Sequence, residues 1–395
     1  RAMAEHPPLP IPDTVLDIAK RLEAAGFETW CVGGAVRDHL LGDANADFDL
    51  ATQATPDQVR AIFRRTVDVG VEFGTVGVLD DARVLHEVTT FRRDVSTDGR
   101  RAVVAFGATL AEDLARRDFT VNAIAYHPVR REWQDPFRGF QDLDAKLVRA
   151  VGKADERFRE DYLRILRGVR FAARFGFTID PATWSAALDA RSGLAGLSAE
   201  RVREEWFKSL RTTRSIPRLM ELWHEVIGAS PWMPELRSAA PRDPGTDTPR
   251  DPVLLTTFLA ERPAVLLERL KASGAEIARA AAIDAGPPAP PGQSEVEIRR
   301  WLSRVTPAVA RDLTALHQLS TGKEPAWAAT MTRILERGDP LDRGALAVHG
   351  SDLLAAGIPA GPRLGQVLKA LLDFVLDVPA RNTKDTLLRH AATLP

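Results

Sequence analysis

The hydrophobic pattern changes character near residue 150 of the 395-residue chain. Before it, short strand-like runs stand between short helical segments, which predicts a mixed head over residues 11–149. After Gly152, apolar residues recur at helical spacing almost to the end of the chain, and strand patterns nearly disappear. The sequence therefore predicts an α+β fold in which a small mixed-sheet head precedes an all-helical remainder.

Individual elements follow from the same pattern. In the head we expect helices at 14–25, 35–41, 55–65 and 110–117, the first with Asp13 as its N-cap. We expect strands at 29–32, 47–51, 75–79, 84–91 and 120–126. Residues 92–105 are polar without a clear period, which predicts a mobile loop. The proline-rich stretches 240–252 and 286–292 are expected to be loops, because proline lacks the amide donor that a helix needs.

Composition excludes several classes of protein. Hydrophobic residues make up 45% of the chain and charged residues 27%, as in an ordinary globular protein. We find no apolar stretch of about 18 residues, and so predict no membrane span. The single cysteine, Cys31, excludes an intrachain disulfide framework and a multi-cysteine zinc site. With no secretory leader recognisable at the start, we expect a cytoplasmic location.

Charge is distributed unevenly along the chain. The net charge of −1 argues against bulk electrostatic binding of nucleic acid, but not against a local basic face. Residues 149–174 contain eight basic and four acidic side chains, so this segment is positive within a nearly neutral chain.

Gly33 and Gly34 stand between a predicted strand and a predicted helix, with Arg37 one turn into that helix. Glycines at such a turn let backbone amides approach a phosphate, and a helix N-terminus adds partial positive charge. A Gly-Gly pair by itself is more often only a tight turn. These three residues therefore become a candidate phosphate cradle only in combination with other groups.

Asp47 and Asp49 lie two residues apart on a predicted strand, so we expect their side chains on one face. Two carboxylates on one face repel each other unless a cation lies between them, which suits Mg²⁺ in phosphoryl transfer. Glu87, on a later strand, would add a third carboxylate. A solvated strand end has the same local pattern, but a phosphate cradle and a metal pair on consecutive strands form the arrangement that nucleotidyl transfer needs.

A third group of polar residues falls at 116–123. Arg117 would reach a phosphate, Asp118 would accept from ribose hydroxyls, and Asn122 would brace the loop. The alternative is a helix C-terminus with favourably placed cations.

A fourth group lies in the basic segment. Asp161 and Arg164 are three residues apart and would share a helix face, with Arg167 and Arg170 on the same side. Such a pair is commonly a simple ion pair. Cytosine and adenine, however, each present an amino donor beside a ring-nitrogen acceptor, which a carboxylate and a guanidinium would satisfy together. Guanine and uracil reverse both partners and would be rejected.

These motifs resemble the class II tRNA nucleotidyltransferases, which are the CCA-adding enzymes, and the related bacterial poly(A) polymerases. The matching strings occur in the family's order and cover roughly residues 27–210. They are GGAVRD (33–38), DFDLAT (47–52), EVTTFRRD (87–94), EDLARRDFTVNAIAY (112–126), DPFRGFQDL (135–143), EDYLRILRGVRFAARFGF (160–177) and SAERVREEWFKSL (198–210).

The resemblance implies a role for each matching residue. It makes Gly34 and Arg37 triphosphate contacts, with Gly33 in the same turn, and makes Asp47 and Asp49 the Mg²⁺ ligands. It places Arg117 and Asp118 at the nucleotide's phosphate and ribose. Four residues would form the base-reading row, in which protein replaces a nucleic-acid template: Asp161, Arg164, Arg167 and Arg170.

The family is built from a head, neck, body and tail, which here would be residues 11–149, 150–214, 215–320 and 321–395. Residues 349–391 are similar to the tail of many CCA-adding members, which favours tRNA as the partner, with CTP and ATP as substrates and no membrane. The expected activity is addition of CCA, or part of it, to the tRNA 3′ end with release of pyrophosphate in a two-metal mechanism.

Two departures from the family's pattern leave alternatives open. Tyr162 stands where a proline usually follows the Glu-Asp pair, and the loop at 94–105 is a little shorter than usual. That loop retains Asp98, Arg100 and Arg101, which disfavours a CC-adding enzyme but leaves an A-adding enzyme possible. A poly(A) polymerase is the other enzymatic alternative, a sugar transferase is disfavoured, and a non-catalytic RNA-binding scaffold is remote. The sequence does not decide whether C, A or both are added, nor the oligomeric state.

Overall fold

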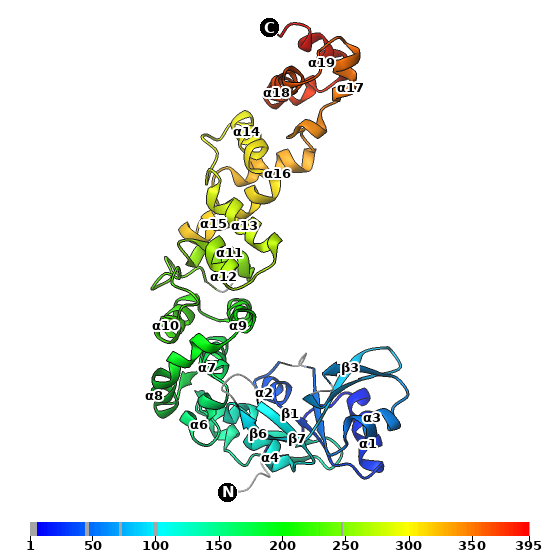
Figure 1. The fold of residues 1–395 in the computed structure, drawn as a ribbon, viewed down its shortest axis with the longest axis vertical. Coiled ribbons are helices and arrows are strands. Elements are labelled where there is room, and N and C mark those ends of the chain that lie inside the picture. The colour runs from blue at the N-terminus through cyan, green and yellow to red at the C-terminus, as the bar shows by residue number, and fades with distance from the viewer. Residues whose placement is uncertain are drawn as a thin grey trace. The chain divides into compact units, whose positions relative to one another are not determined.

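The computed structural model describes residues 6–43, 47–70, 73–97, 102–228, 230–245 and 248–394, with the backbone alone at 93–97 and 102–104. It divides into two compact units, residues 1–234 and 235–395, and the first holds the large sheet (Figure 1). The second is helical throughout its described part. The predicted α+β class is confirmed. No described helix is both long enough and apolar enough to cross a bilayer.

A seven-stranded mixed sheet forms the framework of the first unit, with strand order β3-β4-β5-β2-β1-β8-β9. Its neighbours are antiparallel except for β2 and β5, which run parallel with Leu50 opposite Val88. The strands are β1 Thr29–Val32, β2 Asp49–Thr52, β3 Thr66–Gly70, β4 Thr75–Leu79, β5 Leu85–Thr90, β8 Ala125–His127 and β9 Glu132–Gln134. Two small sheets pair β6 Arg92–Thr97 with β7 Ala102–Phe106, and β10 Leu147–Val148 with β11 Thr178–Ile179.

Helices surround this sheet and then replace it along the chain. They are α1 Asp13–Ala24, α2 Gly34–Leu40, α3 Pro56–Ile62, α4 Leu110–Ala115, α5 Gly139–Asp144, α6 Ala154–Glu160, α7 Leu163–Phe175, α8 Pro181–Ala190, α9 Ala199–Thr212 and α10 Ile216–Ile227. Short 3₁₀ turns lie at Thr120–Asn122 and Arg191–Gly196. Local signals explain several boundaries. Thr55 and Gln58 cap α3 reciprocally, and Gly176 ends α7 in the left-handed conformation that glycine favours.

Several sequence-based expectations are wrong in detail. Asp13 is the first residue of α1, and Pro12 occupies the cap position. Much of 92–105 is the antiparallel β6–β7 hairpin rather than a loop, although 98–101 lie outside the described residues. In 120–126, only the last two residues belong to a strand. The edge strand β3 was not predicted. Its valines alternate with polar residues, but the strand is only five residues long, and both valines are exposed.

Helix α7 is held closely against the head. Gly168 faces the Phe119 ring, and a Cβ at that position would lie 2.9 Å from the ring's Cζ. A side chain there would push the helix away, so glycine permits the contact. Arg149 adds a polar link, because it donates to Asp142 at 3.2 Å and to Asp180 at 2.8 Å. These contacts bring α7 to the edge of the head where the site lies.

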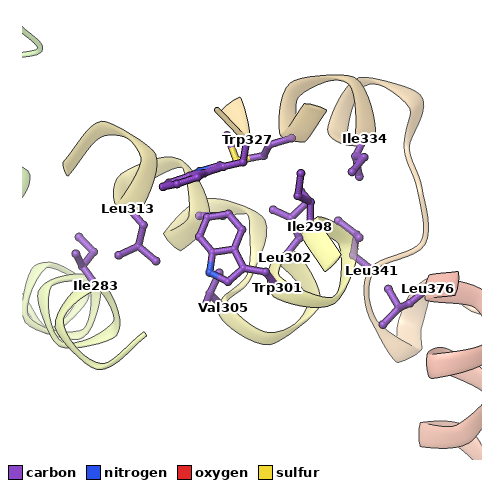
Figure 2. Packing of buried hydrophobic residues seen from close by; sticks show 12 residues of the cluster. Ile283, Ile298, Trp301, Leu302, Val305, Leu313, Trp327, Ile334, Leu341 and Leu376 are labelled. Carbon is purple, nitrogen blue, oxygen red and sulfur yellow. The ribbon is translucent and has the colours of Figure 1, made fainter. Parts of the chain in front are cut away.

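The second unit contains nine described helices and two apolar cores. The helices are α11 Pro252–Leu259, α12 Pro263–Arg269, α13 Gly274–Ala285, α14 Glu295–Val305, α15 Pro307–Thr321, α16 Ala328–Arg337, α17 Gly350–Ala355, α18 Pro362–Asp377 and α19 Lys384–Ala391, with 3₁₀ turns at Arg343–Ala345 and Pro379–Arg381. Figure 2 shows one core, in which Trp301 and Trp327 pack edge to face among aliphatic side chains. The other gathers Val348, Leu371 and Leu387 near the C-terminus. Both proline-rich stretches lie almost wholly between helices, as predicted.

Candidate active site

A cavity of about 590 Å³ lies in the first unit between the sheet and α7. All but two of the sequence-predicted site residues line it, and the exceptions are Asp47 and Glu87. Its charge is unusual, because nine arginines and three aspartates face the same space. The lining residues are Gly33, Gly34, Arg37, Asp49, Arg92, Arg116, Arg117, Asp118, Asn122, Asp161, Leu163, Arg164, Arg167, Arg170, Phe171, Arg174 and Arg201.

The Gly33–Gly34 turn forms one wall. Gly33 has a φ of 76°, and a Cβ there would lie 2.8 Å from Nη1 of Arg117. Both the conformation and the close approach therefore require glycine at this position. The turn leaves backbone and a guanidinium exposed to the cavity side by side, as a phosphate site requires.

Arg37 is buried behind this turn and is held from several sides. Its Nη1 donates to Oδ1 of Asn122, and its Nε donates to Oδ1 of Asp38 at 2.8 Å. The guanidinium also lies over the rings of Phe171 and Phe175, 4.8 and 4.7 Å from their centroids. Burial lowers the pKa of Arg37, while Asp38 opposes that shift. The Arg37 side chain is thus fixed in position, with Asn122 as one of its partners.

The carboxylates lie beside this wall. Asp49 is the first residue of β2, and its strand pairing with β1 ends at Val32, just before the glycine turn. Asp47 precedes the strand, so the expectation that both carboxylates stand on one strand is wrong. Burial, Glu87 and Asp47 raise the pKa of Asp49 to about 6, although Arg117 opposes them. In the described residues no three potential metal-binding side chains are gathered around one point.

This donor set nevertheless fits a hard divalent cation. Asp47, Asp49 and Glu87 offer only carboxylate oxygens, the ligands that Mg²⁺ prefers. Burial, and to a lesser extent the carboxylates of Glu87 and Asp47, disfavour the charged form of Asp49, and a bound cation would offset both effects.

The segment after α4 supplies the next charged group. Arg117 is held by Asp113, whose buried carboxylate accepts from Nη2 at 3.0 Å, while the Arg117 Nε is buried without a hydrogen-bond partner. Asp118 accepts from Arg167 Nε at 2.7 Å and from Asn122 Nδ2 at 2.8 Å. Burial alone would raise the pKa of Asp118, but Arg167 and Asn122 hold it well below its ordinary value. Asp118 is therefore a charged carboxylate at neutral pH.

Asp161 and Arg164 face the cavity, but they do not share one helix as predicted. Asp161 follows α6 in an extended conformation, and its Oδ1 accepts from the Leu163 amide at 3.1 Å, which starts α7 afresh. Its Oδ2 accepts from Arg201 Nη2 at 2.7 Å. Arg164 donates to Glu160 at 2.6 Å and to the Arg116 carbonyl at 3.0 Å. Each side chain is therefore held by other groups, and a simple ion pair within one helix is excluded.

The rest of the arginine row lies on α7. Arg167 is held by Asp118, and the buried Arg170 donates to Glu205 on α9 at 2.7 Å. Burial lowers the pKa of Arg170, and Glu205 opposes the shift. Arg174 donates to Asp38 at 2.9 Å. Successive turns of one helix thus present three guanidiniums to the cavity.

Sequence reasoning missed some of the lining arginines. Arg92, Arg116 and Arg201 belong to strings already quoted, but nothing in local spacing places them at the cavity. Arg201 lies 40 positions after Asp161 in the sequence, and only the folded structure shows that it donates to Asp161 and brings α9 to the site.

Tyr162, between the predicted base-reading residues, lies on the other side of the turn. Its ring occupies the space above Gly193, where a Cβ would stand 2.2 Å from Cε1. Tyr162 also borders a second hollow, between α6 and α8, and does not line the arginine-lined cavity. It supports the turn that carries Asp161.

Comparison with known families agrees with this geometry. Residues 29–149 match the Poly A polymerase head domain, and residues 176–238 match the probable RNA- and SrmB-binding site of polymerase A. Together, the mixed sheet, its carboxylates and the arginine-lined cavity define a nucleotidyltransferase.

Similar proteins of known activity identify the family within this class of nucleotidyltransferases. The chain is 35% identical to the CCA-adding enzyme of Lactiplantibacillus plantarum, covering 95% of this chain and 94% of that protein. It is 34% identical to the CCA-adding enzyme of Streptococcus mutans, with 94% and 95% covered. The crystal structure of the Bacillus stearothermophilus CCA-adding enzyme in complex with CTP is 32% identical, matches with a TM-score of 0.81, and covers 96% of both chains. The chain belongs to the CCA-adding enzyme family, and the resemblance noted in its sequence is confirmed.

Proposed function

We propose that this protein adds CCA, or part of it, to the tRNA 3′ end from CTP and ATP, without a nucleic-acid template and with release of pyrophosphate. One observation carries the proposal. A single cavity brings together a glycine turn, a carboxylate of the sheet and the Asp161–Arg164 pair, so that triphosphate, reaction centre and base would each meet suitable groups. The relatives at 35% and 34% identity carry the same named activity.

The triphosphate would lie against the Gly33–Gly34 turn. Arg117 presents its guanidinium beside Gly33, and Arg37 stands behind it, held by Asn122 and Asp38. These groups would bind the β- and γ-phosphates and hold the pyrophosphate as it leaves. Asp118, kept charged by Arg167, would accept from a ribose hydroxyl and orient the sugar.

Asp47 and Asp49 would hold Mg²⁺, with Glu87 as a further carboxylate nearby. When bound, the metal lowers the pKa of the attacking 3′-hydroxyl and neutralises charge on the phosphates. The neighbouring residues would position the reactants, with the cavity arginines holding the nucleotide and Asp49 and Glu87 facing the incoming RNA end.

Base selection would rest on Asp161 and Arg164. The Asp161 carboxylate can only accept and the Arg164 guanidinium can only donate, so together they match the amino and ring-nitrogen edge of cytosine or adenine. Arg201 and Glu160 hold these two side chains in place, so the recognition groups are oriented before the nucleotide binds. The same proposal places the reaction in the cytoplasm, where tRNA would be met.

A product assay tests this proposal. tRNA transcripts ending at the discriminator base, in C or in CC are incubated with CTP, ATP or both, and products are resolved at single-nucleotide resolution. We expect all three to be completed to CCA. Extension of the CC transcript alone would identify an A-adding enzyme, and a long A ladder on any RNA primer would identify a poly(A) polymerase.

Two further measurements test the assigned roles. Asp47→Ala should abolish incorporation while tRNA binding survives, and retained turnover would refute the metal assignment. A non-catalytic scaffold would show no Mg²⁺-dependent incorporation by the wild type. Asp98, Arg100 and Arg101, which bear on the choice between C and A, lie outside the described residues.

The four-part division into 11–149, 150–214, 215–320 and 321–395 stays a proposal. The compact units instead divide the chain at residues 234 and 235, which is later than the proposed end of the neck.

A further inference from the structure

An exposed aliphatic strip extends from β3 across β4 to β5 at one edge of the large sheet. Val67 and Val69 of β3 and Leu85 of β5 have 43%, 41% and 43% of their surface exposed. Their side chains meet above Gly77 of β4, where a Cβ would lie 2.5 Å from Leu85 Cδ1 and 2.9 Å from Val69 Cγ2. Val67 stands opposite Gly77 in the strand register. We call Val67, Val69 and Leu85 the aliphatic shelf.

The shelf is continuous with the face that carries the catalytic carboxylates. Leu85 and Glu87 are two residues apart on β5 and therefore point to the same side. Leu50 and Val88, which are paired between β2 and β5, are both buried on the opposite side, so Asp49 and Glu87 belong to the shelf's side. Neighbouring strands lie about 5 Å apart, which places the shelf roughly 5–15 Å from Asp49.

Strand order fixes the direction from the phosphates to the shelf. In the order β3-β4-β5-β2-β1, Asp49 on β2 stands between the glycine turn that follows β1 and the shelf on β3–β5. In phosphoryl transfer the attacking oxygen arrives roughly opposite the leaving group. With pyrophosphate held at the glycine turn, the RNA 3′-hydroxyl would approach from the side of the shelf.

We propose that the aliphatic shelf receives the last unpaired nucleotides of the RNA 3′ end, an inference that rests on the proposed function. The faces of these bases are apolar and pack on Val69 and Leu85, while their edges stay in solvent. Contact with base faces is independent of sequence, so one surface serves an RNA end that changes after each addition.

Charge around the shelf fits this occupant. Arg64 and Arg65 directly precede β3 and Arg83 lies in the β4–β5 turn, and all three are exposed. The Leu79 amide donates to the Arg65 carbonyl at 3.0 Å, so these arginines gather near one end of β4. Of the nearby acids, Asp68 pairs with Arg60 and Asp80 contacts His86. Asp81 is exposed in the same turn as Arg83, so three arginines face one acid that no ion pair engages within the described residues. Single-stranded nucleic acid is commonly bound by a basic groove with side chains on which the bases stack, and here the stacking surface is aliphatic instead of aromatic.

A second copy of the chain fits the shelf less well. β3 is only five residues long, and its register with β4 shifts between Asp68 and Gly70, which twists the edge away from flat strand pairing. Pairing two such edges would also bring the arginines of both copies together.

Kinetics with a charged substitution test the proposal. Leu85→Asp should raise the KM for tRNA lacking CCA about tenfold or more, because it removes apolar contact and repels phosphate, and should leave the KM for CTP within twofold. The matched control is Val129→Asp, which changes a valine with 39% exposure between β8 and β9, toward the other edge of the sheet. Thermal unfolding of all three proteins shows whether the variants remain folded.

Crosslinking tests the same contact without changing the shelf. Leu79→p-benzoylphenylalanine places a photoreactive group on the shelf's side of the sheet, because Leu79 is paired with Leu85 between β4 and β5. The RNA is tRNA ending in CC with a 3′ label. Adducts at the last two nucleotides support the proposal. Adducts only in the base-paired stem, no adduct, or a protein–protein dimer would overturn it. If wild type adds no nucleotide, the proposed function fails. If the wild type is active and Leu85→Asp has the same KM for tRNA as Val129→Asp, only the proposal for the aliphatic shelf is refuted.

Discussion

Arginine has different surroundings in the two units of the chain. In the second unit, Arg299, Arg300 and Arg337 are matched by three carboxylates, those of Glu295, Asp339 and Asp377. In the first unit, nine arginines but only three aspartates line the active-site cavity. In the matched cluster the charges pair with each other and need no ligand to balance them. Among the residues that line the cavity, positive charge exceeds negative charge, although carboxylates behind the lining pair with most of these arginines.

Hydrogen bonds fix the orientation of several arginines that line the cavity. Carboxylates outside the cavity lining hold them from behind, with Asp113 on Arg117, Glu160 on Arg164 and Glu205 on Arg170. A guanidinium fixed in this way loses less side-chain freedom when a ligand binds. In the second unit the carboxylates and arginines form one closed cluster. In the first unit the carboxylates lie behind the arginines, whose other edges face the cavity.

The largest effect is expected in the matched cluster. Arg299, whose side chain is 4% exposed, donates to Asp339 and to the carbonyls of Leu376 and Asp377. Arg299→Ala would leave two carbonyls without this donor, while Asp339 keeps its pair with Arg337, and the change should cost about 2–4 kcal/mol of unfolding free energy. Urea denaturation of the full chain measures it, and a loss below about 1 kcal/mol would contradict the matched-cluster interpretation.

A substitution in the cavity should change selectivity instead of stability. Asp161→Asn gives the base-reading position a donor, so UTP and GTP would no longer be repelled. We expect the preference in kcat/KM for CTP over UTP to fall by about 10- to 100-fold, as for loss of one good base contact. Asp155→Asn, an exposed change on α6, is the control. An unchanged preference would remove Asp161 from base selection.

The dependence of stability on acid pH tests whether Asp118 is held charged in the folded protein. The folded pKa of Asp118 lies below its unfolded value near 3.9, so its contribution to stability is complete above about pH 5. As pH falls below about 4, the unfolded chain binds the proton first and this contribution is lost. Asp118→Asn should make the decline of unfolding free energy between pH 5 and 3 shallower by up to about one proton. An identical slope would show that the carboxylate is not held charged.

The smallest effect is expected at the rim of the matched cluster. Arg300 and Asp377 form an ion pair at 2.9 Å with both side chains about half exposed. Solvent screens such a pair, so Arg300→Ala should cost less than about 1 kcal/mol in the same urea experiment. A cost equal to that of Arg299→Ala would mean that burial does not decide the strength of these contacts.

Local pattern predicted the main elements of the head and most of the cavity-lining residues. Gly33, Asp49 and Arg117 are recognisable because their chemistry depends on residue type and short spacing. The pattern did not reveal how Asp161 is presented, because its side chain accepts from the first amide of α7 and contacts Arg201 far along the chain. The β6–β7 hairpin was missed because β6 is mostly polar and β7 is a continuous apolar run, so neither strand shows an alternating pattern. The roles of the individual site residues stay predictions.

Gly193 illustrates how far such long-range dependence extends. The missing side chain at that position gives the Tyr162 ring its place, and Tyr162 is the direct neighbour of Asp161. A bulkier residue at 193 would displace the ring and shift the backbone that presents the carboxylate. If Asp161 selects the base as proposed, a glycine that touches no ligand would help to set which nucleotide is added.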